Sequence, residues 1–156
     1  MHWKKVLQLY RDNHKLLFAA ALAVTRDCSA AEDALHEAVL SVAQSATTPE
    51  NPKAYLLTAI RHAAQKNLRR SRADSQRGEW LAFDDGAAPE DREMLATLAA
   101  AIDNLPAATR EAVVLHAIAG LTFREIGELT RESINTIASR YRRGLSTLRD
   151  HLDEDS

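Results

Sequence analysis

The chain has 156 residues, a length that suits one domain or two small ones, and it is 46% hydrophobic and 27% charged, so it can bury a core. Its single cysteine, Cys28, excludes an internal disulfide and a multi-cysteine metal site, and it fits a reducing cytoplasm. The six histidines show no metal-ligand spacing, so no metal or other cofactor is expected. Glycine and proline are few, and alternating apolar runs are lacking, which predicts an all-α protein.

The N-terminal region predicts a long first helix over residues 3–25. Its apolar stretch at residues 16–24 resembles a secretory signal, but Asp12 interrupts the charged region that precedes it, which favours a core helix. A second helix is expected to begin at Ser29 as N-cap, because Ser29 lies three residues before Glu32 in the capping-box spacing. This part of the chain therefore predicts two helices joined by a tight turn.

The remaining elements follow in order along the chain. A third helix is predicted over residues 52–72, with proline in its first turn. Residues 73–89 lose helical periodicity and predict an interdomain linker, and residues 90–103 predict a short helix. The next helix is predicted over residues 105–120, where a glycine ends it. Because residues 112–119 are apolar almost all round, this helix is expected to be central and buried.

Residues 121–148 predict two helices joined by a tight turn, the second of them apolar on one side and basic on the other. The expected inward positions are Ile134, Ile137, Tyr141, Leu145 and Leu148. The expected outward positions are Asn135, Ser139, Arg142 and Arg143. This pattern is typical of a helix-turn-helix, whose second helix can enter a DNA major groove, but it also fits a solvated surface helix.

The second and third predicted helices are also amphipathic. On the second, the expected core positions are Ala31, Leu35, Ala38, Val39 and Val42, and the outer face carries Glu32, Asp33, His36, Glu37 and Leu40. On the third, the expected core positions are Leu56, Leu57, Ile60, Ala63, Ala64 and Leu68, and the outer face carries Tyr55, Thr58, His62, Gln65, Lys66 and Arg69. Cations beside an aromatic ring suit nucleic acid, and a leucine in an acidic face suits a basic, partly apolar protein partner.

Charge is segregated along the chain although the formal net charge is only −2. Residues 52–77 carry seven basic residues and one acidic residue, whereas residues 78–104 carry seven acidic residues and one basic residue. Residues 131–150 carry five arginines and two acidic residues. Two basic blocks separated by an acidic one indicate two nucleic-acid contacts with an acidic connector, whereas the pI of about 6.3 also fits a mixed-charge surface.

Four segments, in this order, resemble bacterial RNA polymerase sigma factors of the extracytoplasmic-function class. They are AEDALHEAVLSVA (31–43), NPKAYLLTAIRHAAQKNLRR (51–70), LPAATREAVVLHAIAG (105–120) and IGELTRESINTIASR (126–140). The resemblance implies two helical domains, residues 1–72 and 90–156, joined by a flexible acidic linker at 73–89. It also implies a cytoplasmic transcription initiation factor that binds core polymerase and promoter DNA, with an anti-sigma factor as a further partner.

The resemblance carries roles over to individual residues. Glu32, Asp33, Glu37 and Leu40 would contact the polymerase clamp. Tyr55, Thr58, Arg61, His62, Lys66 and Arg69 would lie along the minus-ten strand. Asn135, Thr136, Ser139, Arg140, Arg142 and Arg143 would lie at the minus-thirty-five groove or its phosphates. Asp84 and Asp85 in the linker would pass near the polymerase active-site channel.

Departures from the usual motif keep alternatives open. Arg131 stands where glycine is usual, so it must adopt a left-handed conformation or the turn must be built differently, and Glu132 stands where an apolar residue is usual. One alternative is a sigma-like protein that binds polymerase or a regulator but reads DNA poorly. Another is a dimeric helix-turn-helix repressor, which leaves the N-terminal helices unexplained. An enzyme is the least favoured class, because no nucleophile–base pair, metal cluster or phosphate loop is visible.

Overall fold

The structure is a computed structural model that describes residues 2–45, 49–70 and 89–154. Within these ranges every regular element is a helix, which confirms the all-α prediction. The elements are α1 (His2–Asp12), α2 (His14–Thr25), α3 (Cys28–Gln44), α4 (Pro52–Arg70), α5 (Pro89–Asp103), α6 (Ala107–Val113), the π-helix η2 (Val114–Ile118), α7 (Phe123–Thr130) and α8 (Ile134–Glu154). The predicted linker residues Asp84 and Asp85 lie outside the described residues.

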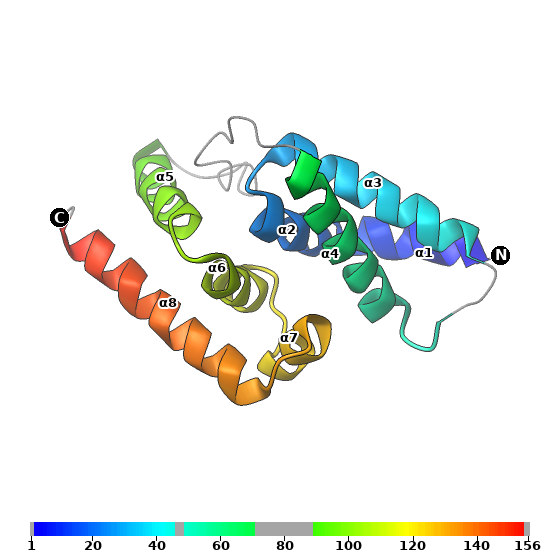
Figure 1. Cartoon of the computed structure of the whole chain (residues 1–156). Helices are drawn as coiled ribbons and strands as arrows, with labels where there is room; N and C mark the ends of the chain where they lie inside the picture. Colours follow the sequence, from blue (N-terminus) through cyan, green and yellow to red (C-terminus); the bar gives the residue numbers. More distant parts are fainter. Residues whose placement is uncertain (1, 46–48, 71–88, 155–156) are drawn as a thin grey trace.

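The helices form two groups, α1–α4 and α5–α8, which lie on opposite sides of the molecule (Figure 1). In the N-terminal group, α2, α3 and α4 pack on one another and α1 packs on α3. All five predicted core positions of α3 are buried, as are those of α4 except Leu68, which is 43% exposed. The 3.6-residue periodicity therefore identified the inward faces of both helices, apart from the last turn of α4.

Two predictions about the first helices are wrong. Residues 3–25 form two helices, because Asn13 interrupts them with φ −121° and ψ 22°. Its side-chain amide donates at 3.0 Å to the carbonyl of Leu9, which also accepts from the backbone N–H of Asn13 at 3.0 Å. Asp27, and not Ser29, caps α3: the Asp27 carboxylate accepts from the backbone N–H of Ser29 at 3.1 Å. Aspartate is as good an N-cap as serine, and here it occupies the extended position before the helix.

In the C-terminal group, α7 and the start of α8 form the predicted helix-turn-helix. Thr122 and Glu125 cap α7 reciprocally in a capping box. A Cβ on Gly127 would lie 2.7 Å from the carbonyl oxygen of Glu132, so only glycine fits beside the turn. Arg131 has φ 60° and ψ 42°, the left-handed conformation that the motif requires, and the backbone N–H of Glu132 closes the turn on the Gly127 carbonyl.

The inward face of α8 differs from the predicted one. Ile137 and Leu148 are buried, but Ile134 is 44% and Leu145 is 37% exposed. Gly144 is buried in their place, because α6 approaches α8 so closely that a Cβ on Gly144 would lie 2.5 Å from Cγ2 of Val113. The glycine lets the two backbones meet, and this contact rotates α8 about its axis relative to the apolar pattern.

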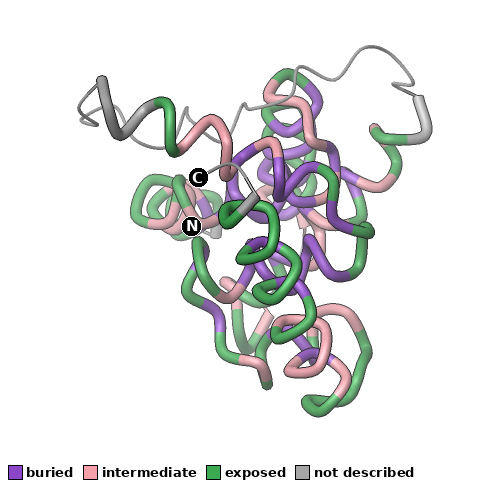
Figure 2. Tube along the Cα trace, turned by 90° about the vertical axis from the view of Figure 1, so that its left-hand side faces the viewer, coloured by how far each residue is buried: buried purple, intermediate pink, exposed green. Residues whose placement is uncertain are grey.

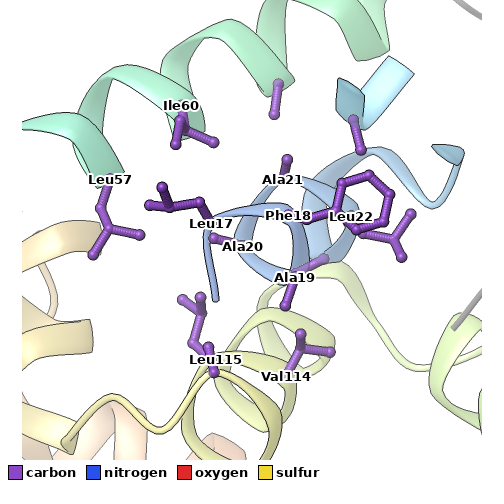
Figure 3. Close-up of a cluster of buried hydrophobic side chains, with 14 of the residues drawn as sticks. Leu17, Phe18, Ala19, Ala20, Ala21, Leu22, Leu57, Ile60, Val114 and Leu115 are labelled. Atoms are coloured by element: carbon purple, nitrogen blue, oxygen red, sulfur yellow. The ribbon is translucent and has the colours of Figure 1, made fainter. Parts of the chain in front are cut away.

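The two groups share one hydrophobic core. Leu17 and Ala19 of α2 lie between Ile60 of α4 and the side chains of Val114 and Leu115 of η2 (Figure 3). Buried residues of both groups belong to one hydrophobic cluster, and they appear as separate purple segments along the chain in Figure 2. The prediction that the segment at 112–119 is central holds for its first four residues and Ala119, but Ala117 and Ile118 are exposed.

Arginines add polar contacts between the groups. Arg110 of α6 is only 6% exposed, and its Nε donates to the carbonyl of Ala23 at 2.8 Å. Its Nη1 donates to the carbonyl of Leu105, and Arg26 donates to the carbonyl of Asp103 at 2.7 Å. Burial lowers the pKa of Arg110 from its ordinary value, and the nearby charge of Arg26 lowers it further. These guanidiniums lie at the carboxyl ends of α2 and α5, where the helix dipole favours cations.

In the described ranges, no helix is both long and apolar enough to cross a membrane.

Replacing Arg131 by glycine is expected to stabilise the protein by about 0.5–1 kcal/mol. A left-handed L-residue costs about 1–2 kcal/mol, and the extra freedom of glycine in the unfolded chain offsets part of the gain. Urea unfolding followed by circular dichroism measures the change. Arg26→Gly is the matched comparison, because Arg26 is also left-handed, with φ 56°, but its side chain contacts Asp103. Equal stabilisation by both substitutions would contradict this account.

Candidate nucleic-acid interface

The outer face of α3 presents an acidic surface with one large apolar side chain. Glu32, Asp33 and Glu37 are exposed, and Leu40 is 60% exposed. The opposite face of α3 is packed in the core, so the helix presents these four side chains from a rigid support. The structure therefore brings together all four residues predicted for a protein partner.

A groove of about 400 Å³ runs between α3 and α4. Its walls include Glu37 and Ser41 of α3 and, from α4, four of the predicted minus-ten residues: Tyr55, Thr58, His62 and Lys66. The Tyr55 ring is 49% exposed, and the Nζ of Lys66 lies 3.0 Å from a carboxylate oxygen of Glu37. The groove thus combines an accessible aromatic ring with a cation held at its edge, which is a suitable chemistry for an unpaired base and its phosphate.

The start of α4 is fixed by capping. The side-chain oxygen of Asn51 accepts from the backbone N–H of Ala54 at 3.1 Å. The Thr58 hydroxyl donates to the carbonyl of Ala54 at 3.0 Å, so its proton is already engaged and the oxygen of this groove-lining residue remains as an acceptor. The sequence could not reveal this, since the outward position of Thr58 says nothing about which way its hydroxyl donates.

Arg61 does not share the groove with the other predicted minus-ten residues. Its guanidinium makes a bidentate ion pair with Glu111 of α6, with Nε–Oε2 2.9 Å and Nη2–Oε1 3.0 Å. Glu111 is 50 residues away in sequence and almost buried, so no local pattern predicts the contact. Leu68 lines the same side of α4, which explains why this predicted core residue is exposed. The side chain of Arg69 lies outside the described part of the chain.

The predicted minus-thirty-five residues lie along the exposed side of α8. Asn135, Arg142 and Arg143 are exposed, and Thr136, Ser139 and Arg140 are half-buried. The Thr136 hydroxyl lies 2.8 Å from that of Ser133, whose oxygen also accepts from the Thr136 backbone N–H. The Nη2 of Arg140 lies 3.4 Å from the Glu132 carboxylate. Asn135, Arg142 and Arg143 are therefore the most accessible of the six.

An aromatic cluster that the sequence did not predict holds α8 against the preceding helices. The ring of His116 lies 4.3 Å from that of Phe123 and 4.7 Å from that of Tyr141, measured between centroids. Its Nδ1 donates to the carbonyl of Leu121 at 2.8 Å, because a carbonyl can only accept. Tyr141 belongs to α8, so the cluster joins η2, the start of α7 and the candidate recognition helix.

Within the described ranges, no group of three or more His, Cys, Asp or Glu residues could hold a metal ion. The surfaces instead offer guanidinium and ammonium groups, amides, hydroxyls and an exposed aromatic ring on two separate helices. These groups suit hydrogen bonds to phosphates and base edges, and stacking on bases.

Comparison with known proteins assigns both helical groups to one family. Residues 9–73 match the family described as Sigma-70 region 2, and residues 95–148 match the family described as Sigma-70, region 4. The first match covers most of α1–α4, and the second covers the helix-turn-helix and most of α5 and α8.

Two curated relatives agree with this assignment. The ECF RNA polymerase sigma factor SigE of Mycolicibacterium smegmatis is 44% identical over 66 residues, which are 42% of this chain and 26% of that protein. The ECF RNA polymerase sigma factor SigK of Mycobacterium ulcerans is 28% identical over 145 residues, covering 83% of this chain and 76% of that protein. The chain therefore spans about a quarter of the first relative and about three quarters of the second.

The fold is also similar to that of a solved structure, the sigma factor RpoE in complex with the anti-sigma factor NepR from Bartonella quintana. The TM-score is 0.69 at 23% sequence identity, over 98% of this chain and 97% of that one. The region matches occur in the order of the two helical groups, and both curated relatives are ECF sigma factors. The chain belongs to the sigma-70 family of RNA polymerase sigma factors, in its extracytoplasmic-function class.

Proposed function

We propose that this protein binds core RNA polymerase and directs promoter recognition and transcription initiation, without catalytic activity of its own. One observation carries this proposal. The N-terminal helical group matches sigma-70 region 2 and the C-terminal group matches region 4, and each group presents basic residues. The protein acts in the cytoplasm, where polymerase and promoter DNA are found. An anti-sigma factor is a further partner in this proposal, supported by the similar fold of RpoE, which was solved with NepR.

The outer face of α3 is the polymerase-binding surface in this proposal. Three exposed carboxylates, those of Glu32, Asp33 and Glu37, precede the exposed Leu40 on this face of α3. A basic surface with an apolar pocket is the complementary partner, because the charges guide encounter while the leucine supplies apolar burial. The free chain has a net charge of −2 and so has little overall attraction for DNA. In this proposal the complex with polymerase supplies the positive electrostatic potential that attracts DNA.

The groove between α3 and α4 reads the minus-ten element as a single strand. Tyr55 stacks on an unpaired base, and Lys66 and Arg69 hold phosphates. His62 and Thr58 lie on the same wall of the groove and supply hydrogen bonds to base edges. Flipping bases out of a duplex costs a few kcal/mol per step, and contacts of this kind to the displaced strand offset that cost.

Helix α8 reads the minus-thirty-five element in the major groove. Asn135, Thr136 and Ser139 lie in its first turns, the part of a recognition helix that contacts base edges. Arg142 and Arg143 lie further along and contact phosphates. Arg131 stands where the family motif usually has glycine, but it adopts the left-handed conformation, and Gly127 leaves room for the Glu132 carbonyl, so the turn has its usual form. The turn therefore gives no reason to favour a sigma-like protein that reads DNA weakly.

The most direct test of this function is run-off transcription with purified core polymerase on genomic fragments. We expect discrete transcripts that appear only when the protein is added, because core polymerase alone does not select promoters. Binding to core polymerase without any promoter-specific transcript would overturn the proposed function and favour a purely regulatory interaction.

Reversing the character of the α3 surface is expected to abolish polymerase binding. Asp33→Arg combined with Leu40→Asp removes one guiding charge and the apolar anchor, and both side chains are exposed, so folding should persist. Pull-down of core polymerase should fall at least about tenfold, equivalent to about 1.4 kcal/mol. Asp12→Arg, an exposed reversal on α1, is the matched control and should bind normally. Unchanged pull-down by the double variant would rule out this surface.

The two kinds of contact on α8 should separate in holoenzyme binding assays. Arg142→Ala should weaken binding to all sequences about equally and lower the salt slope by about one, because it removes a phosphate contact. Asn135→Ala should instead relax preference at one or two base pairs, at a cost of about 1–3 kcal/mol each. Binding to a promoter and its point variants at several salt concentrations measures both effects. If the two substitutions exchange these behaviours, the proposed orientation of α8 is wrong.

A further inference from the structure

A cleft of about 300 Å³ opens where the two helical groups meet, and three arginines line it. Arg61 comes from α4, Arg110 from α6 and Arg140 from α8. Two carboxylates line the same cleft, those of Glu111 and Glu132. Because arginine stays protonated in proteins, the titratable lining of this cleft carries one more positive charge than negative charge.

Each of these arginines keeps hydrogen-bond donors that no residue in the described part of the chain uses. Arg61 donates to Glu111 through Nε at 2.9 Å and Nη2 at 3.0 Å, which leaves Nη1. Arg110 donates through Nε and Nη1, which leaves Nη2, and Arg140 donates through Nη2 alone. Guanidinium groups bind carboxylates and phosphates through such N–H donors, so the cleft offers spare anion-binding groups from three helices.

Arg110 gives the strongest indication of a bound anion. It is only 6% exposed, and both of its hydrogen bonds go to uncharged main-chain carbonyls. In the described ranges no fully buried side-chain nitrogen lacks a hydrogen-bond partner, so the unused Nη2 must be open to solvent, and Arg110 lines this cleft. Burial lowers the pKa of Arg110 and the charge of Arg26 lowers it further, although Asp103 and Glu111 act in the opposite direction. A further negative charge near Nη2 would therefore stabilise the protonated guanidinium.

The remaining lining suits the organic part of a small molecule. Leu68 is 43% exposed and Val24 is half-buried, and both line the cleft. Gln65 adds an amide, and Thr130 adds a hydroxyl that donates to the carbonyl of Ile126 at 2.8 Å and keeps its oxygen as an acceptor. A water takes about 30 Å³ in the liquid, so a cleft of about 300 Å³ has room for an anionic group together with an apolar group.

We propose that this cleft binds a small phosphomonoester, whose phosphate accepts hydrogen bonds from Arg61, Arg110 and Arg140 and whose organic part packs against Leu68. A phosphomonoester carries a charge of about −1.5 to −2 at pH 7 and three acceptor oxygens. Guanidiniums from three helices match that arrangement better than they match a carboxylate, which has one charge and two oxygens. This inference does not rest on the proposed roles of the protein at polymerase and promoter DNA.

Isothermal titration calorimetry of the full chain with phenyl phosphate tests the site, with inorganic phosphate and phenol titrated in parallel. We expect saturable binding of phenyl phosphate with a Kd of about 1 mM or tighter, weaker binding of inorganic phosphate, and no binding of phenol. The comparison with inorganic phosphate measures the apolar contact, and the comparison with phenol measures the charge. The inference is overturned if phenyl phosphate shows no saturable binding, or if either of the other two probes binds as tightly.

Two substitutions in the cleft should change the affinity for phenyl phosphate in opposite directions. Arg140→Met removes a charged donor and should weaken binding at least about tenfold. Glu132→Gln removes a repelling charge and should tighten binding about threefold. The matched controls are Arg124→Met and Glu93→Gln, which remove the same charges at exposed positions outside the cleft lining and should bind as the unmodified chain does.

A cleft variant that binds phenyl phosphate with the affinity of its matched control would show that the site is wrongly placed. Circular dichroism checks that each variant folds, which we expect because the side chains of Arg140 and Glu132 are 27% and 40% exposed. If Arg140→Met does not fold, the comparison of Glu132→Gln with Glu93→Gln decides the outcome alone.

Discussion

The packing of α6 and η2 against α2 on one side and of α6 against α8 on the other is the constraint on which the rest of the structure depends. Val114 and Leu115 contribute to the core formed with α2 and α4, while Val113 packs against Gly144 of α8. One short segment thereby supports both proposed DNA-reading helices. Burying Arg110 in it is tolerable only because the carbonyls of Ala23 and Leu105 accept its hydrogen bonds, since an unpaired buried cation would be strongly destabilising.

This central position of α6 divides the polar residues of α4 between two environments. Tyr55, His62 and Lys66 open onto the groove with α3 and are accessible, whereas Arg61 faces α6 and is held by Glu111. A similar division occurs on α8, where Arg142 and Arg143 are exposed and Arg140 is paired with Glu132. The accessible residues suit contact with nucleic acid, whereas the paired ones are held by carboxylates of the same chain.

The Arg61–Glu111 pair joins the two helical groups beside their shared apolar core. Ion pairs between exposed residues contribute little, but this pair is bidentate and nearly buried, so it is shielded from salt.

The sequence by itself determined the features that depend on local periodicity and local chemistry. The two faces of α3, the groove-side residues of α4, the end of the buried helix at Gly120 and the helix-turn-helix all follow from spacing, side-chain size and turn geometry. The sequence left the conformation of Arg131 open, and the structure shows that it is left-handed. The order of the motifs was enough to indicate the family. These features were predictable because each is fixed by residues within about two helical turns of one another.

The tertiary structure decided what depends on residues far apart in the chain. Gly144 replaced Ile134 and Leu145 on the inner side of α8 because α6 approaches it closely, and periodicity carries no information about a neighbouring backbone. Arg61 points away from the groove between α3 and α4 because Glu111, 50 residues later, pairs with it. Two local features were also not predicted: the break between α1 and α2 at Asn13, and the capping of α3 by Asp27 and not Ser29. In each case the local sequence permits two structures of similar propensity, and packing of the surrounding helices decides between them.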